Sequence, residues 1–410
     1  MRSDRMRWLV LIVGMLAMIA GSTSQYGLAY LIPAFRDEGL SLEQAGLLVA
    51  CPTAGVMLTL IAWGAAADRW GERVVLSTGL GLAGLFLLAA RWAPGTASLA
   101  VLLALSGAAG ASVLASGRLI LGWFARHERA LAMGIRQSAQ PMGLALAAAT
   151  LPALASGGTG VPLLFLSALF LAAATAAFLL VRDPAPVPSA ATAEKATGPA
   201  SGVGAPYRTP VLWRVHAASA LLVVPQFTIT TFALVFLTDA RGWSALAAGH
   251  LLAGAQVCGA FSRLAAGYWS DRTGSRLRPM RIIAVTTGAG MLVLAAAAAA
   301  GSSVAVPVLL FLGVVAVSSN GLSFTAVAEY AGSAWAGRAL GIQTTGQNVM
   351  TAATPPVIAM AIGAVSFAPS FAVVAVFPLI AALLVPVAAE EGMAAGESEP
   401  AGTAPASGRH

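Results

Sequence analysis

The sequence predicts an all-α integral membrane protein in which twelve transmembrane helices form two pseudo-symmetric six-helix bundles. Three observations support this fold class. Of the 410 residues, 58% are hydrophobic and only 10% are charged, whereas about a quarter of the residues in a soluble globular chain are charged. Apolar runs of about 20 residues, each long enough to cross a bilayer, recur along the whole chain. The second half of the chain also repeats features of the first half.

Twelve apolar runs mark the expected helices. The expected spans are 8–33, 43–66, 74–94, 98–124, 131–156, 159–181, 212–238, 245–269, 282–301, 304–328, 338–364 and 369–389. The first run follows a basic start and is too long for a signal-peptide core, so we expect an uncleaved helix. The 44 glycines are typical of helices that pack closely in lipid.

The segment between Arg182 and Tyr207 is rich in Pro, Ala, Thr, Ser and Gly, a composition that cannot bury a core. It separates six expected helices from the next six. We therefore predict an N-terminal six-helix bundle at 1–182, a cytoplasmic linker at 183–210, a C-terminal six-helix bundle at 211–389 and a disordered cytoplasmic tail at 390–410.

The positive charges predict how the chain lies in the cell membrane. With the N-terminus inside, the outside loops contain only Arg36, Arg91 and Arg241, while seventeen of the 23 Lys and Arg residues lie on the cytoplasmic side. The positive-inside rule then places both termini of this multi-pass protein in the cytoplasm. Because these charges lie in short loops between apolar runs, we expect them to set topology, and we expect no nucleic acid partner.

Counting residues excludes several classes of protein. Lys195 is the only lysine, and no G-x-x-x-x-G-K-[ST] pattern is present, so the sequence lacks a phosphate-binding loop. Cys51 and Cys258 lie in apolar runs away from any cluster of His, which argues against a zinc site or a disulfide. We expect no metal, no cofactor and no enzymatic activity. An intramembrane enzyme or a non-transporting sensor is kept as a remote alternative.

An internal repeat relates the two halves. A shift of 203 positions aligns Gly46, Gly64, Asp68, Arg69, Gly71 and Arg73 with Gly249, Gly267, Asp271, Arg272, Gly274 and Arg276. A shift of 207 aligns Ala132, Gly134, Ile135 and Gln140 with Ala339, Gly341, Ile342 and Gln347. Two parallel six-helix repeats are common in secondary transporters, which bind their substrate near the midplane between the halves.

The same motif ends two of the expected helices, as G-A-A-A-D-R-W-G-E-R at 64–73 and G-Y-W-S-D-R-T-G-S-R at 267–276. It resembles the signature of the major facilitator superfamily, G-x-x-x-D-[RK]-x-G-[RK]-[RK]. The resemblance covers the whole chain and implies a transporter that works by alternating access. It also implies a latch for the outward-facing state, formed by Gly64, Asp68, Arg69, Gly71 and Arg73 and, in the second copy, by Gly267, Asp271, Arg272, Gly274 and Arg276. The sequence departs from the motif at Glu72, where the superfamily usually has a base.

Three arginines, Arg118, Arg136 and Arg263, are expected at membrane depth, where a charge is costly and indicates function. No Asp or Glu is expected in the middle of a span, so an anionic substrate is a suitable partner for this positive charge. The run from Arg263 through Gly267 to Asp271 is similar to helix 8 of monocarboxylate and oxalate porters, in which the arginine meets a carboxylate. Arg118 resembles a helix-4 arginine that is linked to proton transfer, which makes it a candidate coupling residue. Structural pairing or interface anchoring is the alternative for both Arg118 and Arg263.

Polar residues in the middle of spans are further candidates for substrate contact. Arg136 and Gln140 are four residues apart and share a helix face, and the repeat gives Gln343 and Gln347 the same relation. Such pairs suit a cleft between two bundles, although hydrogen bonding between helices is the alternative role. The other candidates are Gln25, Tyr26, Gln226 and Asn320.

These features predict a secondary active transporter that takes up a small organic anion, by proton symport or by exchange. The expected partners are an anionic small molecule, protons as a coupling ion and the lipid bilayer, and we expect a monomer. The tract 133–137 is also similar to cyanate-permease-type members of the superfamily. A proton-coupled exporter of drugs or metabolites is the alternative. The helix-5 motif of antiporters, G-x-x-x-G-P-x-x-G-G, is however reduced here to Gln140-Pro141-Met142-Gly143.

Overall fold

The computed structural model describes residues 2–115, 123–124, 129–182, 206–332 and 335–390, and every regular element in these ranges is a helix. Ten helical segments of this part of the chain are long and apolar enough to cross a membrane. The other two expected spans, 98–124 and 131–156, fall on the shorter helices α5 and α6 and on the 26-residue helix α8. The all-α membrane fold predicted from the sequence is therefore confirmed.

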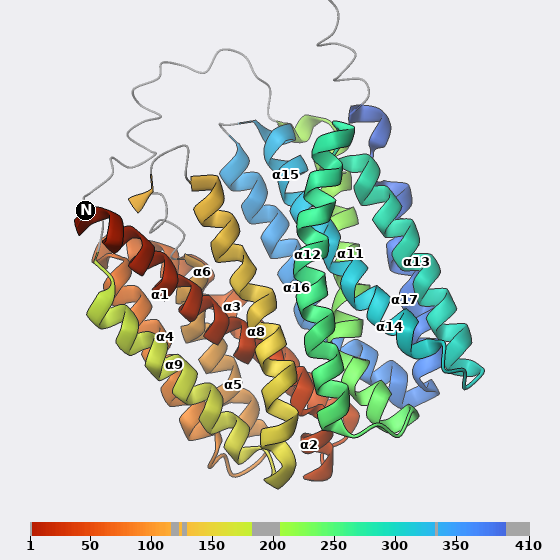
Figure 1. Ribbon diagram of the computed structural model, residues 1–410, viewed down its shortest axis with the longest axis horizontal. Helices are drawn as coiled ribbons and strands as arrows, with labels where there is room; N and C mark the ends of the chain where they lie inside the picture. The colour runs from red at the N-terminus through yellow and green to blue at the C-terminus, as the bar shows by residue number, and fades with distance from the viewer. Residues whose placement is uncertain (1, 116–122, 125–128, 183–205, 333–334, 391–410) are drawn as a thin grey trace, which may run out of the picture.

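The first half of the chain forms one group of helices (Figure 1). Its elements are α1 (Arg2–Gln25), η1 (Gly27–Leu31), α2 (Ile32–Asp37), α3 (Leu42–Trp70), α4 (Glu72–Ala90), α5 (Thr96–Gly110), α6 (Ser112–Ala115), α8 (Arg129–Leu154), η2 (Ala155–Gly157) and α9 (Gly160–Leu180). Helix α4 packs along α5 and α9, and α1 packs along α8 and α9. Fully buried leucines of α4, among them Leu76, Leu80 and Leu87, lie at the centre of this group.

The second half forms a matching group. Its elements are η3 (Pro206–Arg208), α11 (Val211–Val235), η4 (Phe236–Ala240), α12 (Ala245–Thr273), α13 (Leu277–Ala299), α14 (Ala305–Val315), η5 (Ala316–Ser318), α15 (Ser319–Ala331), α16 (Ala336–Val365) and α17 (Phe367–Leu384). Helix α11 is the most deeply buried of the membrane segments and packs against α16 and α17. Helix α17 in turn packs along α13.

The repeat in the sequence is also a repeat of local structure. Ser41 and Ser244, which are 203 positions apart, each cap a helix by accepting a hydrogen bond from the backbone N–H three residues further on. Gly71 and Gly274, in the two copies of the motif, end α3 and α12 with φ of 81° and 60°. These are conformations that residues with a Cβ rarely adopt, so the glycines are required by the turns.

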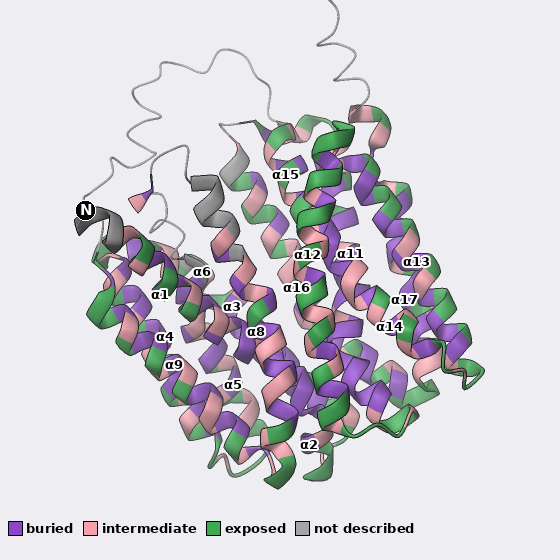
Figure 2. Ribbon diagram, viewed as in Figure 1, coloured by how far each residue is buried: buried purple, intermediate pink, exposed green. Residues whose placement is uncertain are grey.

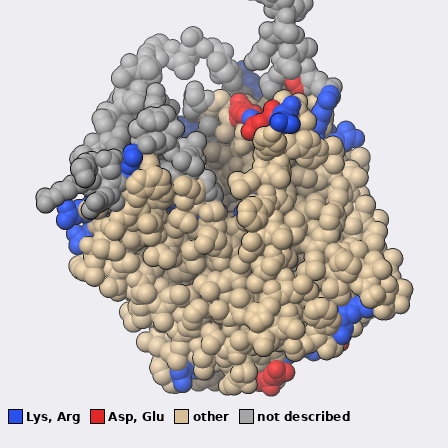
Figure 3. Space-filling view, in the orientation of Figure 1, with Lys and Arg blue, Asp and Glu red and all other residues tan. Residues whose placement is uncertain are grey.

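The outer surface matches a bilayer. Figure 2 shows buried residues mainly between the helices and exposed residues on their outer faces. Many of those exposed side chains are large and apolar, such as Leu82, Leu85, Val293 and Leu383. Charged side chains gather at the two ends of the molecule, and the band between them is almost free of charge in Figure 3. Such a band is what the hydrocarbon core of a membrane requires.

The two halves meet along α8 with α12 and α3 with α16. Here we call the end at which α1 begins the terminal end, and the end with α2 and η4 the distal end. Helices α8 and α12 lie apart at the terminal end and converge toward the distal end (Figure 1). Figure 3 shows the surface hollowed between the halves on the terminal side.

Two glycines permit the close approach at the distal end. A Cβ on Gly249 of α12 would lie 2.4 Å from the carbonyl oxygen of Ala148 and 2.9 Å from Cγ of Pro152, both on α8. A Cβ on Gly46 of α3 would lie 2.7 Å from Cβ of Ala359 on α16. The two seams are equivalent under the repeat, because the shift of 203 relates the glycines and the shift of 207 relates Pro152 to Ala359.

Candidate functional site

Arg263 lies on α12 where this helix crosses α8 from the other half. Its Nη1 atom donates to Oε1 of Gln140 at 3.4 Å, while its Nε atom is buried and has no hydrogen-bond partner in the described chain. The ion pairs found within the described residues do not include Arg263. Arg263 is partly buried, and a buried donor without a partner such as its Nε is costly, so this position is suited to receive an anion.

Tyr26 completes the surroundings of Arg263 from the first half. It lies between α1 and η1, and its hydroxyl group interacts with both Arg263 and Gln140. Its ring packs against Phe227 of α11, with 5.4 Å between the ring centroids. Arg263, Gln140 and Tyr26 therefore bring three segments from both halves together at one point.

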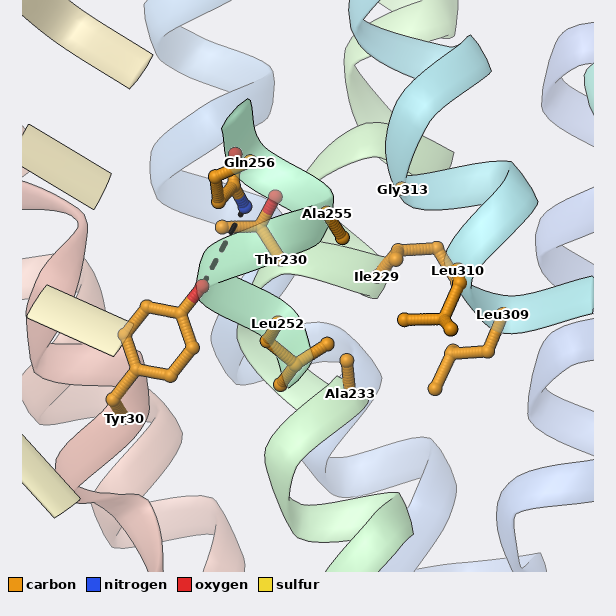
Figure 4. A pocket seen from close by; sticks show the side chains of 10 residues that line it. All are labelled: Tyr30, Ile229, Thr230, Ala233, Leu252, Ala255, Gln256, Leu309, Leu310 and Gly313. Atoms are coloured by element: carbon orange, nitrogen blue, oxygen red, sulfur yellow. Dashed lines mark hydrogen bonds between the residues drawn. The ribbon is translucent and has the colours of Figure 1, made fainter. Parts of the chain in front are cut away.

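A small pocket lies on the distal side of this point (Figure 4). The Tyr30 hydroxyl accepts a hydrogen bond from Nε2 of Gln256 at 3.5 Å. The pocket is lined by Tyr30, Ile229, Thr230, Ala233, Leu252, Ala255, Gln256, Leu309, Leu310 and Gly313. Gln256 and Arg263 are seven residues apart on α12, so they share a helix face about 10 Å apart along the axis. The wall distal to Arg263 is thus mainly apolar.

Arg136 is buried inside the first half. Its Nη2 atom donates to the carbonyl oxygen of Val113 at 2.9 Å, and only 8% of the residue is exposed. The carboxylate of Glu72, at the start of α4, is the acidic group that interacts with it. Glu72 is itself buried, with an exposed fraction of 4%. The excess of embedded positive charge that the sequence suggested is therefore smaller than expected.

Gln343 and Gln347 are held within the second half. Oε1 of Gln343 accepts from Nδ1 of His216 at 2.6 Å, and its Nε2 donates to the Ser219 hydroxyl at 2.6 Å. Nε2 of Gln347 donates to the same hydroxyl at 2.7 Å. Gln343 is 2% exposed, whereas Gln347 is only partly buried.

The remaining candidates are also placed by hydrogen bonds. Gln25 donates to the Thr53 hydroxyl at 3.3 Å, inside the first half. Asn320 donates to Oε1 of Gln226 at 3.2 Å, inside the second half. Arg118 lies outside the described residues.

The two copies of the motif lie at the terminal end, and each bonds within its own half. Nε of Arg73 donates to the carbonyl oxygen of Phe178 at 2.8 Å. Arg276 pairs with Asp271 and, at 3.3 Å, with Glu329, and its hydrogen bond to Asp271 raises the pKa of its guanidinium.

The other motif residues complete this arrangement. Arg69 lies over the Trp70 ring and Arg272 over the Tyr268 ring. A Cβ on Gly64 or Gly267 would meet no atom within 4 Å. The side chain of Asp68 is outside the described part of the chain.

Three features of the structure were not expected from the sequence. Glu72 was read only as a departure from the motif, yet it is the acid beside Arg136. His216, near the start of α11, is buried in a hydrogen-bonded network. Arg36 and Asp239 form an ion pair between the halves at the distal end. The last feature had a signal, because these residues are 203 positions apart and carry opposite charges.

Comparison with known proteins agrees with this architecture. The family model described as Major Facilitator Superfamily matches residues 10–355. Two uncharacterized MFS-type transporters of Mycobacterium tuberculosis, from strains ATCC 25618 / H37Rv and CDC 1551 / Oshkosh, are each 41% identical over 384 residues. Each match covers 93% of this chain and 85% of the relative.

Solved structures share the fold at low sequence identity. An inward-facing, occupied bacterial homologue of the human lysosomal transporter Spinster superposes with a TM-score of 0.76 at 17% identity, covering 93% of this chain and 96% of that one. A D-xylose–proton symporter gives a TM-score of 0.75 at 16% identity, covering 92% of this chain and 97% of that one.

Proposed function

The chain belongs to the major facilitator superfamily, and on this premise we propose that it takes up a small organic anion by alternating access. It is a multi-pass membrane transporter and not an enzyme. The proposal concerns the class of its substrate and the residue that binds it. Arg263 is the residue on which the proposal rests.

The observation that supports an anionic substrate is the unpaired charge of Arg263 between the two halves. An ionised group at membrane depth needs a partner, and no acidic residue of the described chain pairs with it. Arg136, in contrast, interacts with Glu72 and bonds to Val113. We therefore assign the substrate carboxylate to Arg263, with Gln140 and Tyr26 as neighbouring polar contacts.

The distribution of charge supports an orientation with both termini in the cytoplasm of the cell. In that orientation the distal end faces outward, and the hollow on the terminal side opens to the cytoplasm. The conformation described is then the one that releases an imported substrate. A Cβ added at Gly64 would meet no atom within 4 Å here. We infer that the superfamily motif at 64–73 forms its contacts with neighbouring helices when the terminal end closes.

An exporter of drugs is the second candidate function. Lipophilic cations are usually held by an embedded carboxylate, and Glu72 is the one acid that the structure describes as buried among the membrane helices. Glu72 interacts with Arg136, so it is poorly placed to hold a cation. The arrangement therefore favours an anion over a cation.

Ligand binding to purified protein tests the substrate class. The melting temperature would be measured with small mono- and dicarboxylates, inorganic anions, sugars and lipophilic cations, because a ligand that binds the folded state stabilises it. We expect a carboxylate to raise the melting temperature. Arg263→Ala should weaken binding about 10- to 150-fold, the usual loss for a hydrogen bond to a charged group, and Arg263→Lys should weaken it less.

The control is Arg91→Ala, which removes an exposed arginine at the distal end and should bind like the parent. Uptake of the stabilising carboxylate into proteoliposomes would follow the same order. An unchanged affinity in Arg263→Ala would overturn the assignment of the site. Stabilisation by lipophilic cations alone would favour the exporter.

A further inference from the structure

A buried hydrogen-bonded network surrounds His216 in the second half. His216 lies on α11 and has an exposed fraction of 8%. Its Nε2 atom lies 3.1 Å from the Tyr207 hydroxyl on η3, and its Nδ1 atom lies 2.6 Å from Oε1 of Gln343 on α16. Gln343 and Gln347 both continue to Ser219. The network connects the segment just before α11 with the two helices α11 and α16.

The direction of each hydrogen bond in this network can be assigned. The Ser323 hydroxyl donates to the carbonyl oxygen of Asn320, so the Ser219 hydroxyl donates to Ser323. Ser219 therefore accepts from the amide groups of both glutamines, which turns Oε1 of Gln343 toward His216. An amide oxygen only accepts, so Nδ1 of His216 carries a hydrogen.

Nε2 of His216 is the free position for a second proton. In the neutral imidazole this atom accepts from the Tyr207 hydroxyl. When Nε2 takes a proton, it donates to the Tyr207 oxygen, and the hydroxyl hydrogen turns away. Tyr207 is only partly buried, and burial raises the pKa of its hydroxyl, so it stays protonated and in reach of water. His216 can therefore gain and lose a proton while the rest of the network stays in place.

No acid compensates a charge at His216 in the described conformation. The polar contacts of His216 in the described chain are Tyr207 and Gln343 alone. Besides Tyr207, the charged and titratable residues of the described elements around it are Arg208 on η3, Arg214 on α11, His250, Cys258, Arg263, Tyr268, Asp271 and Arg272 on α12, Arg278 and Arg281 on α13, Glu329 and Tyr330 on α15, and Arg338 on α16. Helix α17 has none.

The neighbouring charges have other partners. Arg214 donates to the carbonyl oxygens of Leu383 and Leu384. Arg338 lies 4.9 Å from the Trp335 ring centroid, and Glu329 pairs with Arg276. The ring nitrogens of His216 therefore face a hydroxyl and an amide oxygen, and no carboxylate of the described chain contacts them.

We propose that His216 is the proton-binding site of the transport cycle. The inference rests on the proposed transport function and adds the group that couples it to protons. A proton binds to the lone pair of Nε2 while the halves are arranged differently, and it leaves through the Tyr207 side when the terminal end is open. The described conformation places a hydroxyl and an amide oxygen beside this imidazole but no carboxylate, so a conformation that binds the proton more tightly would gain population in acid.

Spin-label distances across the terminal end test this proposal without knowledge of the substrate. Labels would be attached at Leu179→Cys on α9 and Ile282→Cys on α13, both exposed, after Cys51→Ala and Cys258→Ala. Between about pH 8 and about pH 5, we expect the long distance of the open terminal end to give way to a shorter one. One coupled proton changes the ratio of the two populations by up to about tenfold per pH unit.

Two variants and one control decide the outcome. His216→Gln should remove the pH response, and His250→Gln, which changes an exposed histidine on α12, should keep it. Tyr207→Phe keeps the ring but loses the oxygen that accepts from the charged imidazole, so its response should move to lower pH. This variant decides the matter if His216→Gln fails to fold.

A parent protein without a pH response, or an unchanged response in His216→Gln or in Tyr207→Phe, would overturn the proposal. Carboxylate binding by Arg263 is measured separately at one pH. The anion site and the proton site can therefore fail independently of each other.

Discussion

At the scale of single residues, the two repeats place different chemistry at equivalent positions. Arg136 of α8 and Gln343 of α16 are related by the shift of 207, and both are buried. Arg136 interacts with the acid Glu72, while Gln343 bonds to the titratable His216. One half therefore places a buried acid near a buried arginine, where the other half places a histidine. This asymmetry suggests a structural role for the first position and a switching role for the second.

The charge pair of Glu72 and Arg136 leads to a prediction about stability. Glu72→Gln leaves the Arg136 guanidinium buried without its acid, and breaking a buried pair in this way costs about 3–5 kcal/mol. We expect a marked fall in the melting temperature of the purified protein. Asp37→Asn, which changes an exposed acid at the end of α2, should leave it unchanged.

A second substitution separates a charge pair from a role of Glu72 alone. Replacing both partners, as Glu72→Leu with Arg136→Met, removes the buried charge and should recover most of the lost stability. If the double variant is as unstable as the sum of the two single variants, Glu72 and Arg136 do not act as a pair.

At the scale of the helices, the seams between the halves depend on the absence of a side chain. Any Cβ at position 249 would overlap the Ala148 carbonyl group, at 2.4 Å. Gly249→Ala should therefore push α12 away from α8 and open the distal end. Overpacking of this kind costs about 1–3 kcal/mol. The ratio of molecules with an open distal end to molecules with a closed distal end should therefore rise about 5- to 150-fold. Gly46→Ala should act in the same direction on the equivalent seam.

Labelling of a single cysteine measures this opening. Ala255→Cys places a thiol in the wall of the distal pocket, in a chain without Cys51 and Cys258. A membrane-impermeant maleimide added at the distal side should react faster in Gly249→Ala. Gly254→Ala lies on the same helix, at a glycine whose added Cβ meets no atom within 4 Å, and should label like the parent. Equal rates in the two glycine variants would contradict the role of the seam.

The helices were the part of the structure most open to prediction from the sequence. A bilayer demands long apolar runs, and the caps at Ser41 and the turn at Gly71 have local causes that the sequence displays. The site was less predictable. Arg263 was one of its candidates, and its contact with Gln140 depends on how α8 crosses α12. The network of His216 joins three elements that are far apart in sequence, and no local pattern indicates such a meeting.

At the scale of the whole molecule, the observed contacts describe one state of a rocking cycle. The distal end is held by two glycine seams and by the ion pair between Arg36 and Asp239. At the terminal end, the motif residues described above bond within their own halves. Closing the terminal end requires the distal contacts to separate. A change that weakens the distal contacts should therefore raise the population of molecules whose terminal end is closed.

The ion pair of Arg36 and Asp239 gives the prediction for this scale. Both side chains are more than a third exposed, at 39% and 34%, and such pairs contribute only about 0.2–1 kcal/mol. Arg36→Asp should therefore shift the population toward the state with a closed terminal end by about 1.4- to 5-fold. The spin labels at Leu179→Cys and Ile282→Cys report this shift at fixed pH.

The exchange of the two charges is the decisive comparison. Arg36→Asp combined with Asp239→Arg restores the attraction between the halves and should return the distance distribution to that of the parent. Raising the salt concentration should reduce the difference between Arg36→Asp and the parent, because exposed charges are screened. If the exchanged pair remains shifted like Arg36→Asp, the distal end is held by packing at Gly46 and Gly249 alone. The ion pair would then have no part in selecting the conformation.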